Sequence, residues 1–169
     1  MASELRVDKI VPTDGAPTGG GGGIVQVKQF TLTNSANGGF FIQTSSSTWT
    51  ASPLLLAITP KFSTSKILIN VNSSSYNAGN GHTPYTIYRD STNIGGATYG
   101  MADFTGAHTW TPFSMMFLDS PATTSSITYA LQGLRGSAGT FYFGRNDTDS
   151  DAAETGRCPT IITAKEVAA

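Results

Sequence analysis

Charged side chains are scarce in this sequence. Asp, Glu, Lys and Arg make up 12% of its 169 residues, about half of the usual share. Ten basic and eleven acidic side chains leave a net charge of -1. Proteins that bind nucleic acids concentrate positive charge on one face, so this balance argues against a nucleic-acid partner. The sequence also has no basic cluster that would bind a membrane surface.

Cysteine and long apolar runs are missing as well. Cys158 is the only cysteine, which excludes an intrachain disulfide and a zinc site built from several cysteines. We expect Cys158 to be a small buried residue of the last strand. The longest apolar run, "LLLAI", is too short for a signal peptide or a membrane-spanning helix. We therefore predict neither secretion through a signal peptide nor membrane insertion.

Catalytic and metal-binding motifs are also lacking. His82 and His108 are the only imidazoles, and neither belongs to a zinc motif. No serine lies in the G-x-S-x-G pattern of hydrolases. A glycosidase needs two carboxylates in one cleft, and four acidic residues are the candidates for that role: Asp90, Asp103, Asp119 and Glu154. Because nothing in their spacing singles out a pair, we predict a protein that is not an enzyme and has no cofactor.

One acidic segment resembles part of a calcium loop. Asp147, Asp149 and Asp151 follow the one, three, five spacing that brings alternate carboxylates to one cation. The rest of the signature fails, since Ala152 replaces the required glycine and Cys158 replaces the bidentate glutamate. The pattern is a weak metal candidate, and a solvated acidic loop between two strands is the simpler interpretation.

Serine, threonine, asparagine and glycine replace the missing charge. These residues suit turns and the outward faces of strands better than helix interiors. Short runs with strand periodicity recur from residue 24 onward, each ended by Gly, Pro, Asn or Ser. We predict strands over residues 24–32, 39–44, 53–59, 66–72, 85–90, 94–100, 109–119, 127–134, 140–145 and 159–167.

The clearest of these strands is "KILINVN", in which Ile67, Ile69 and Val71 alternate with polar residues. Residues 91–93, "STN", separate two of the runs and are typical of a hairpin turn. No segment repeats the apolar spacing of a helix over three turns. The chain is therefore predicted to be all-β, an antiparallel β-sandwich or jelly-roll knob.

The first 23 residues differ from the rest of the chain. "SELRVDKIV" alternates like a strand, but it cannot bury enough area to fold by itself. Five glycines, residues 19–23, then have the composition of a flexible linker. We predict three parts: an extended N-terminal arm (1–18), a glycine-rich linker (19–23) and the knob (24–169). The apolar residues that we expect to carry attachment of the arm are Leu5, Val7, Ile10 and Val11.

Several aromatic residues lie among Asn, Asp and Gly. Aromatic faces with neighbouring amides and carboxylates hold carbohydrate in shallow sites. The candidates for such a site are Trp49, Trp110, Tyr76 and Tyr99. The alternative is that most of these aromatics belong to the core or to an interface between subunits.

Two parts of the sequence carry a resemblance to a known family. "SELRVDKIVPTDGAPTGGGGGIVQV" resembles the N-terminal attachment segment of small virion fibre proteins from tailed bacteriophages, particularly those that infect cyanobacteria. The order "ITPKFSTSKILINVN", "YRDSTNIG", "FLDSPATTSSITYALQ", "GTFYFGRN" and "TIITAKEV" is similar to the β-rich head domain of the same proteins. Together these segments cover nearly the whole chain.

The resemblance implies a homotrimeric knob whose N-terminal arms bind another virion protein. It implies a location on the virion surface, on the tail, neck or baseplate, after assembly in the host cytoplasm. A short fibre fits better than a long one, since only the glycine linker separates arm and knob. A capsid decoration protein and an adhesin for host surface polysaccharide are the alternatives.

Overall fold

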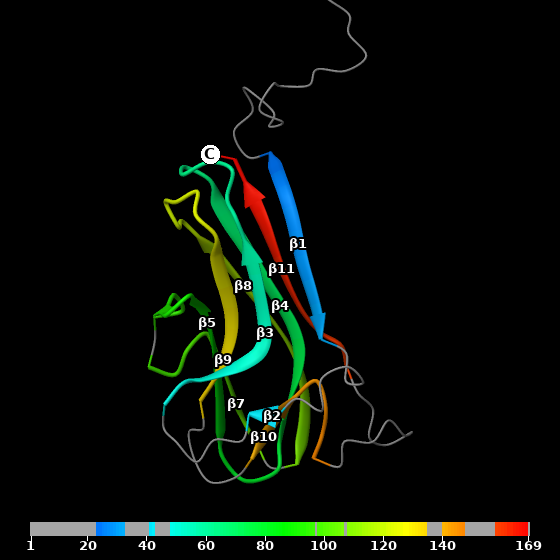
Figure 1. Ribbon diagram of the computed structural model, residues 1–169. Helices are drawn as coiled ribbons and strands as arrows, with labels where there is room; N and C mark the ends of the chain where they lie inside the picture. Colours follow the sequence, from blue (N-terminus) through cyan, green and yellow to red (C-terminus); the bar gives the residue numbers. More distant parts are fainter. Residues whose placement is uncertain are drawn as a thin grey trace, which may run out of the picture.

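The computed structural model describes residues 23–32, 41–42, 48–96, 98–106, 108–134, 140–147 and 158–168, with the backbone alone at 41–42. All regular structure in these ranges is β-strand (Figure 1). The N-terminal arm and residues 19–22 of the linker lie outside them. The strands are β1 (Ile24–Leu32), β2 (Phe41–Ile42), β3 (Thr50–Ile58), β4 (Lys66–Asn77), β5 (His82–Arg89), β6 (Thr92–Asn93), β7 (Ala102–Thr105), β8 (Thr109–Asp119), β9 (Ile127–Gly133), β10 (Phe141–Phe143) and β11 (Thr160–Val167).

The strands form two antiparallel sheets. In the first sheet, the long strand β4 pairs with β8 on one edge, and with β11 and β10 end to end on the other. β1 continues the sheet beside β11, and β2 beside β10. The second sheet has the order β3, β9, β5, with β6 and β7 on the far edge of β5. β3 packs against β1 and β11, which brings the two sheets together as a sandwich (Figure 1).

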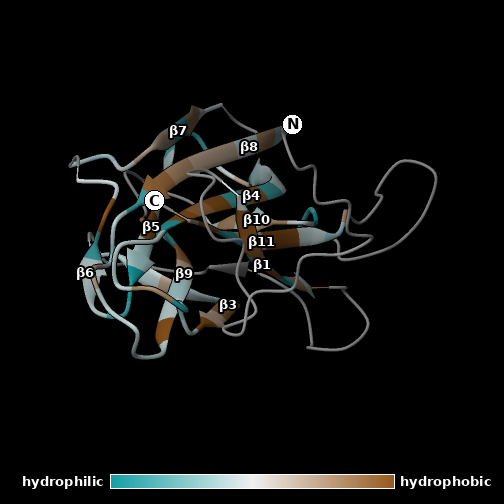
Figure 2. Cartoon of the chain, turned by 90° about the horizontal axis from the view of Figure 1, so that it is seen from above, coloured by the Kyte–Doolittle hydropathy of each residue, from teal (hydrophilic) through white to brown (hydrophobic). Residues whose placement is uncertain are grey.

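The core lies between the two sheets and is built by alternation along the strands. On β4, Ile67, Ile69 and Val71 are fully buried, while Lys66 and Asn72 are exposed. The second sheet contributes fully buried side chains such as Tyr85 and Leu131. Figure 2, seen from above, shows the apolar segments of both sheets in brown. The predicted all-β fold and the alternation of residues 66–72 are therefore confirmed.

Polar side chains also lie in this interior. Ser75 of β4 and the hydroxyl of Tyr85 on β5 form a hydrogen bond of 2.9 Å between the sheets. Glu166 of β11 is completely buried, and its carboxylate accepts hydrogen bonds from Gln26 Nε2 (2.6 Å) and Lys61 N (2.7 Å). Glu166 thereby joins β11, β1 and the loop after β3.

Two sequence expectations are wrong. Residues 94–100 form no strand among their described positions, because Gly96 and Gly100 adopt positive φ values of 71° and 68° that turn the chain. The strand that pairs with β5 after this turn is β7, which was not predicted. Cys158 is exposed and lies in the loop before β11, not in the strand. Its N–H donates a hydrogen bond of 2.8 Å to Gly144 O, which holds it in this loop.

Candidate functional site

Three aromatic side chains form a row on the outer face of the first sheet. The register pairs Tyr76 of β4 with Trp110 of β8 on one edge and with Tyr142 of β10 on the other. Directly paired residues point to the same face of a sheet. Ser75 and Asn77, the neighbours of Tyr76, are buried on the inner side, so the three rings lie outside. We call Trp110, Tyr76 and Tyr142 the aromatic row.

Polar partners fix the central tyrosine. The Tyr76 hydroxyl lies 3.2 Å from His108 Nδ1, and the two rings meet edge to face with centroids 6.3 Å apart. His108 follows β7 in a left-handed backbone conformation (φ 51°), and its N–H donates a hydrogen bond of 2.7 Å to Asn77 O. Burial and a hydrogen bond with the Asp147 carboxylate raise the pKa of the Tyr76 hydroxyl.

An arginine fixes the outer tyrosine. The guanidinium carbon of Arg145 lies 4.8 Å from the centre of the Tyr142 ring, within the range of a cation–π interaction. The Tyr76 and Tyr142 rings are 6.2 Å apart and inclined at 52°. Only 7% of Arg145 is exposed, so its charge is turned toward the protein.

The other two predicted aromatics lie in a different place. Trp49 precedes β3 and Tyr99 precedes β7, both strands of the second sheet. Trp49 Cη2 is 2.8 Å from the position that a Cβ would take at Gly100. Tyr99 is exposed, with its ring 6.3 Å from that of His82. The structure thus brings Trp110 and Tyr76 together but separates them from Trp49 and Tyr99.

Sequence reasoning missed Tyr142. The strand around it was predicted, and its neighbours Phe141 and Phe143 are buried, so the alternation does place Tyr142 on the outside. Its position beside Tyr76 depends on the pairing of β10 with β4, two segments 65 residues apart along the chain. That pairing leaves no local signal in the sequence.

The acidic residues of the weak metal candidate lie only partly within the structure. Asp147 is described and exposed, and its carboxylate helps raise the pKa of the Tyr76 hydroxyl. Asp149 and Asp151 lie outside the described residues. Within the described ranges, no group of three His, Cys, Asp or Glu side chains could hold a metal ion.

The candidate catalytic carboxylates have separate partners. Asp90 Oδ1 accepts a hydrogen bond from Thr128 N (2.9 Å), and Asp103 Oδ2 lies 2.8 Å from His82 Nδ1. Asp119 is buried and paired with Arg89. Glu154 lies outside the described residues. Each of the three described carboxylates is thus engaged with another group of the protein, and none of them lines the pocket between β4, β5, β7 and β8.

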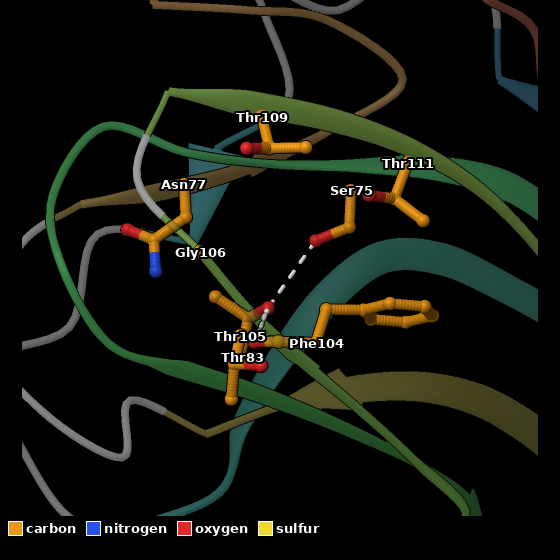
Figure 3. A pocket seen from close by; sticks show the side chains of 8 residues that line it. All are labelled: Ser75, Asn77, Thr83, Phe104, Thr105, Gly106, Thr109 and Thr111. Atoms are coloured by element: carbon orange, nitrogen blue, oxygen red, sulfur yellow. Dashed lines mark hydrogen bonds between the residues drawn. The ribbon is translucent and has the colours of Figure 1, made fainter.

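A small polar pocket opens between β4, β5, β7 and β8 (Figure 3). It has room for about one water molecule. A hydrogen bond of 3.3 Å joins the hydroxyls of Ser75 and Thr83 at its wall. The lining residues carry no carboxylate, imidazole or amine, so this pocket supplies no general acid or base: Ser75, Asn77, Thr83, Phe104, Thr105, Gly106, Thr109 and Thr111.

The predicted attachment residues Leu5, Val7, Ile10 and Val11 lie outside the described residues, and their role stays a prediction. Among the residues that the structure places, no helix has the length and apolar character needed to cross a membrane. Comparison with models of known protein families finds no match, and comparison with curated proteins finds none either.

Proposed function

We propose that this chain is a non-enzymatic structural protein of a bacteriophage virion. In this proposal, residues 24–169 form the knob of a short trimeric fibre, and residues 1–18 attach it to another virion protein. The resemblance of both segments to small virion fibre proteins supports the assignment. The all-β sandwich is the kind of fold that this resemblance implies.

The observation that carries the proposal is a strip of apolar side chains on the outer face of the first sheet. The register aligns Leu118, Leu68, Lys165 and Val27 in one row across β8, β4, β11 and β1. Met116 lies on the same face one row away and is 64% exposed. We call Val27, Leu68, Met116 and Leu118 the apolar strip. Lys165 lies between Leu68 and Val27 in this row, so the strip consists of apolar side chains on either side of one lysine. Exposed apolar side chains that gather on one face mark a contact with another molecule.

We propose that other copies of the same chain bind to this strip. β1 is an edge strand, and Ile24 and Val27 on it are both more than half exposed. Three copies that cover one another's strips in a closed ring would remove this apolar area from water and protect the open edge of β1. The apolar side chains and the unprotected strand edge thus support self-association, and the number of three copies is what the resemblance to virion fibre proteins implies.

β1 begins beside the same strip. Gly23 O accepts a hydrogen bond of 2.9 Å from Ala168 N, which fixes the chain where β1 begins. The segment that precedes residue 23 therefore starts close to the apolar strip. In a trimer, three arms would begin near one another, and their combined binding would gain from a high effective concentration.

The oligomeric state tests the first part of the proposal. Light scattering on the purified full-length chain at micromolar concentration is expected to give three times the mass of one chain. A monomer at that concentration would contradict the trimer.

Removal of the arm tests the second part. We expect a chain that lacks residues 1–18 to remain trimeric and to be lost from assembled particles. Retention on the particle without the arm would show that the knob itself is the attached part. Image reconstruction of the particle would then distinguish a tail, neck or baseplate fibre from a capsid decoration protein.

A further inference from the structure

The geometry of the aromatic row points to a second role: we infer that the row binds a neutral saccharide chain. The row lies at the end of β4 remote from the apolar strip, because Tyr76 is eight residues beyond Leu68 on the same strand. At about 3.3 Å per residue, Tyr76 lies roughly 26 Å from Leu68, and Trp110 lies roughly 20 Å from Met116, six residues along β8. The inference is therefore independent of how the apolar strip is covered.

Core packing does not account for the row. Inner positions of β4 alternate with outer ones, and the inner neighbours Ser75 and Asn77 are already buried. Trp110, Tyr76 and Tyr142 are half-buried on the outer face, one from each of three adjacent strands. Aromatic side chains in this arrangement offer apolar faces that sugar rings stack against through their C–H groups.

The row is held in place before any ligand binds. Arg145 packs on the Tyr142 ring at 4.8 Å, and His108 contacts the Tyr76 hydroxyl at 3.2 Å. The backbone of His108 is itself fixed through its hydrogen bond to Asn77 O. Side chains that are already ordered lose little conformational entropy on binding, which favours even a shallow site.

Polar groups beside the rings match the hydroxyl groups of a sugar. His108 is exposed and offers a ring nitrogen that donates or accepts. Asp147 is exposed, and its carboxylate is near enough to the central ring to help raise the pKa of the Tyr76 hydroxyl. Sugar hydroxyls both donate and accept hydrogen bonds. The Asp147 carboxylate accepts, and the His108 imidazole can donate or accept, so the two groups beside Tyr76 serve both needs.

The charges around the row select a neutral ligand. Asp147 is exposed, whereas Arg145 is 7% exposed and packs on Tyr142. Lys66 lies at the opposite end of β4, ten residues from Tyr76, and Lys165 is paired with Leu68 near that end. An acidic sugar would thus meet an exposed carboxylate without a neighbouring lysine from these strands, and repulsion would oppose its binding.

An array of immobilised glycans tests the inference on the full-length protein. The array holds neutral oligosaccharides of glucose, mannose, galactose and N-acetylglucosamine, together with oligosaccharides of uronic acids. We expect binding to at least one neutral glycan and none to the uronic acids. Absence of binding to every neutral glycan, or binding to uronic acids alone, would overturn the inference.

Variants then locate the site. Each is titrated in solution with the glycan that bound on the array. Trp110→Ala is expected to raise the Kd at least tenfold, and Trp49→Ala, the matched change at the only other tryptophan, is expected to leave it unchanged. In Trp49→Phe, the remaining tryptophan fluorescence comes from Trp110 and should change on titration. An unchanged Kd in Trp110→Ala would disprove the location.

A second variant guards against loss of folding. Tyr142→Leu keeps an apolar side chain on this face and removes the aromatic ring, together with the ring surface on which Arg145 packs. We expect the same loss of binding with an unchanged circular dichroism spectrum. Full binding by a folded Tyr142→Leu protein would exclude Tyr142 from the site, and the inferred row with it.

Discussion

Arg89 and Asp119 connect the two sheets of the sandwich through an ion pair in which Asp119 is buried and Arg89 is partly exposed. Arg89 Nη1, on β5 of the second sheet, lies 2.9 Å and 2.8 Å from the two carboxylate oxygens of Asp119, at the end of β8 in the first. The Tyr129 hydroxyl of β9 donates a third hydrogen bond, of 2.6 Å, to the same carboxylate. Asp119 thus satisfies two groups of the opposite sheet at once.

Replacement of Asp119 is expected to destabilise the fold strongly. Asp119→Ala leaves the Arg89 charge and the buried Tyr129 hydroxyl without their acceptor, a loss of about 3 kcal/mol in the free energy of unfolding. Asp103→Ala is the matched control, because the His82–Asp103 pair is solvent-exposed and should contribute at most about 1 kcal/mol. Urea unfolding of both variants measures the difference, and equal losses would contradict the assigned role.

The buried carboxylate of Glu166 predicts a dependence of stability on pH. Burial opposes its charge, but hydrogen bonds from Gln26 and the backbone of Lys61 and Phe62 outweigh this effect and lower its pKa from the ordinary 4.5. The unfolded chain then takes up the proton first as the pH falls. The contribution of Glu166 is complete above about pH 5 and is lost as the pH falls through the folded-state pKa.

Glu166→Gln tests this sign. The carboxylate accepts hydrogen bonds from the N–H groups of Gln26, Lys61 and Phe62. In glutamine, an NH₂ group replaces one of the accepting oxygens, so the variant should be less stable at pH 7 by about 2 kcal/mol. It should also lose less stability than the wild type between pH 5 and pH 3, since it has no carboxylate to protonate there. Denaturant titrations at each pH measure the free energy of unfolding of both proteins. An equal loss in the two proteins between pH 5 and pH 3 would refute the effect.

Two glycines with similar backbone angles should respond differently to alanine. Both Gly96 (φ 71°) and Gly100 (φ 68°) are in the left-handed region, where alanine costs about 1 kcal/mol. A Cβ at Gly96 meets open space, whereas one at Gly100 would collide with Tyr85 O and Trp49. We expect Gly100→Ala to lower the melting temperature markedly more than Gly96→Ala. Similar shifts would mean that Trp49 and the loop move aside.

The apolar strip provides a direct test of self-association. Leu118→Glu and Met116→Glu place a charge among exposed apolar side chains and should convert the proposed trimer to folded monomers. Ser114→Glu is the control, because Ser114 lies on the same face of β8, two residues from Met116 and outside the strip. Sedimentation velocity on the three variants distinguishes them. Dissociation by Ser114→Glu as well would mean that the interface extends beyond the strip.

Local pattern predicted most of the strands, and tertiary contacts decided the rest. Residues 24–32 and 109–119 were predicted with the bounds that β1 and β8 have, because both segments are bounded by clear turn residues. Residues 94–100 contain strand-forming side chains, but the positive φ values at Gly96 and Gly100 override them.

The candidate site depended on pairing that a single sequence does not contain. Trp110 and Tyr76 were selected for their residue type, and only the register of β4 with β8 and β10 makes them neighbours and adds Tyr142. Trp49 has the same residue type and similar polar neighbours in the sequence, yet it packs near Gly100 instead.

The position of β4 has a mechanical consequence. This strand carries the aromatic row at one end and part of the apolar strip at the other, and it is paired along both edges. If a saccharide bound at the aromatic row were pulled while the apolar strip was held by other subunits, the force would run along β4. The hydrogen bonds between β4 and its neighbouring strands would then be loaded in shear. Many hydrogen bonds would then share the load at once, whereas a pull at right angles would open them one by one. The sandwich is thus built to withstand tension directed along β4.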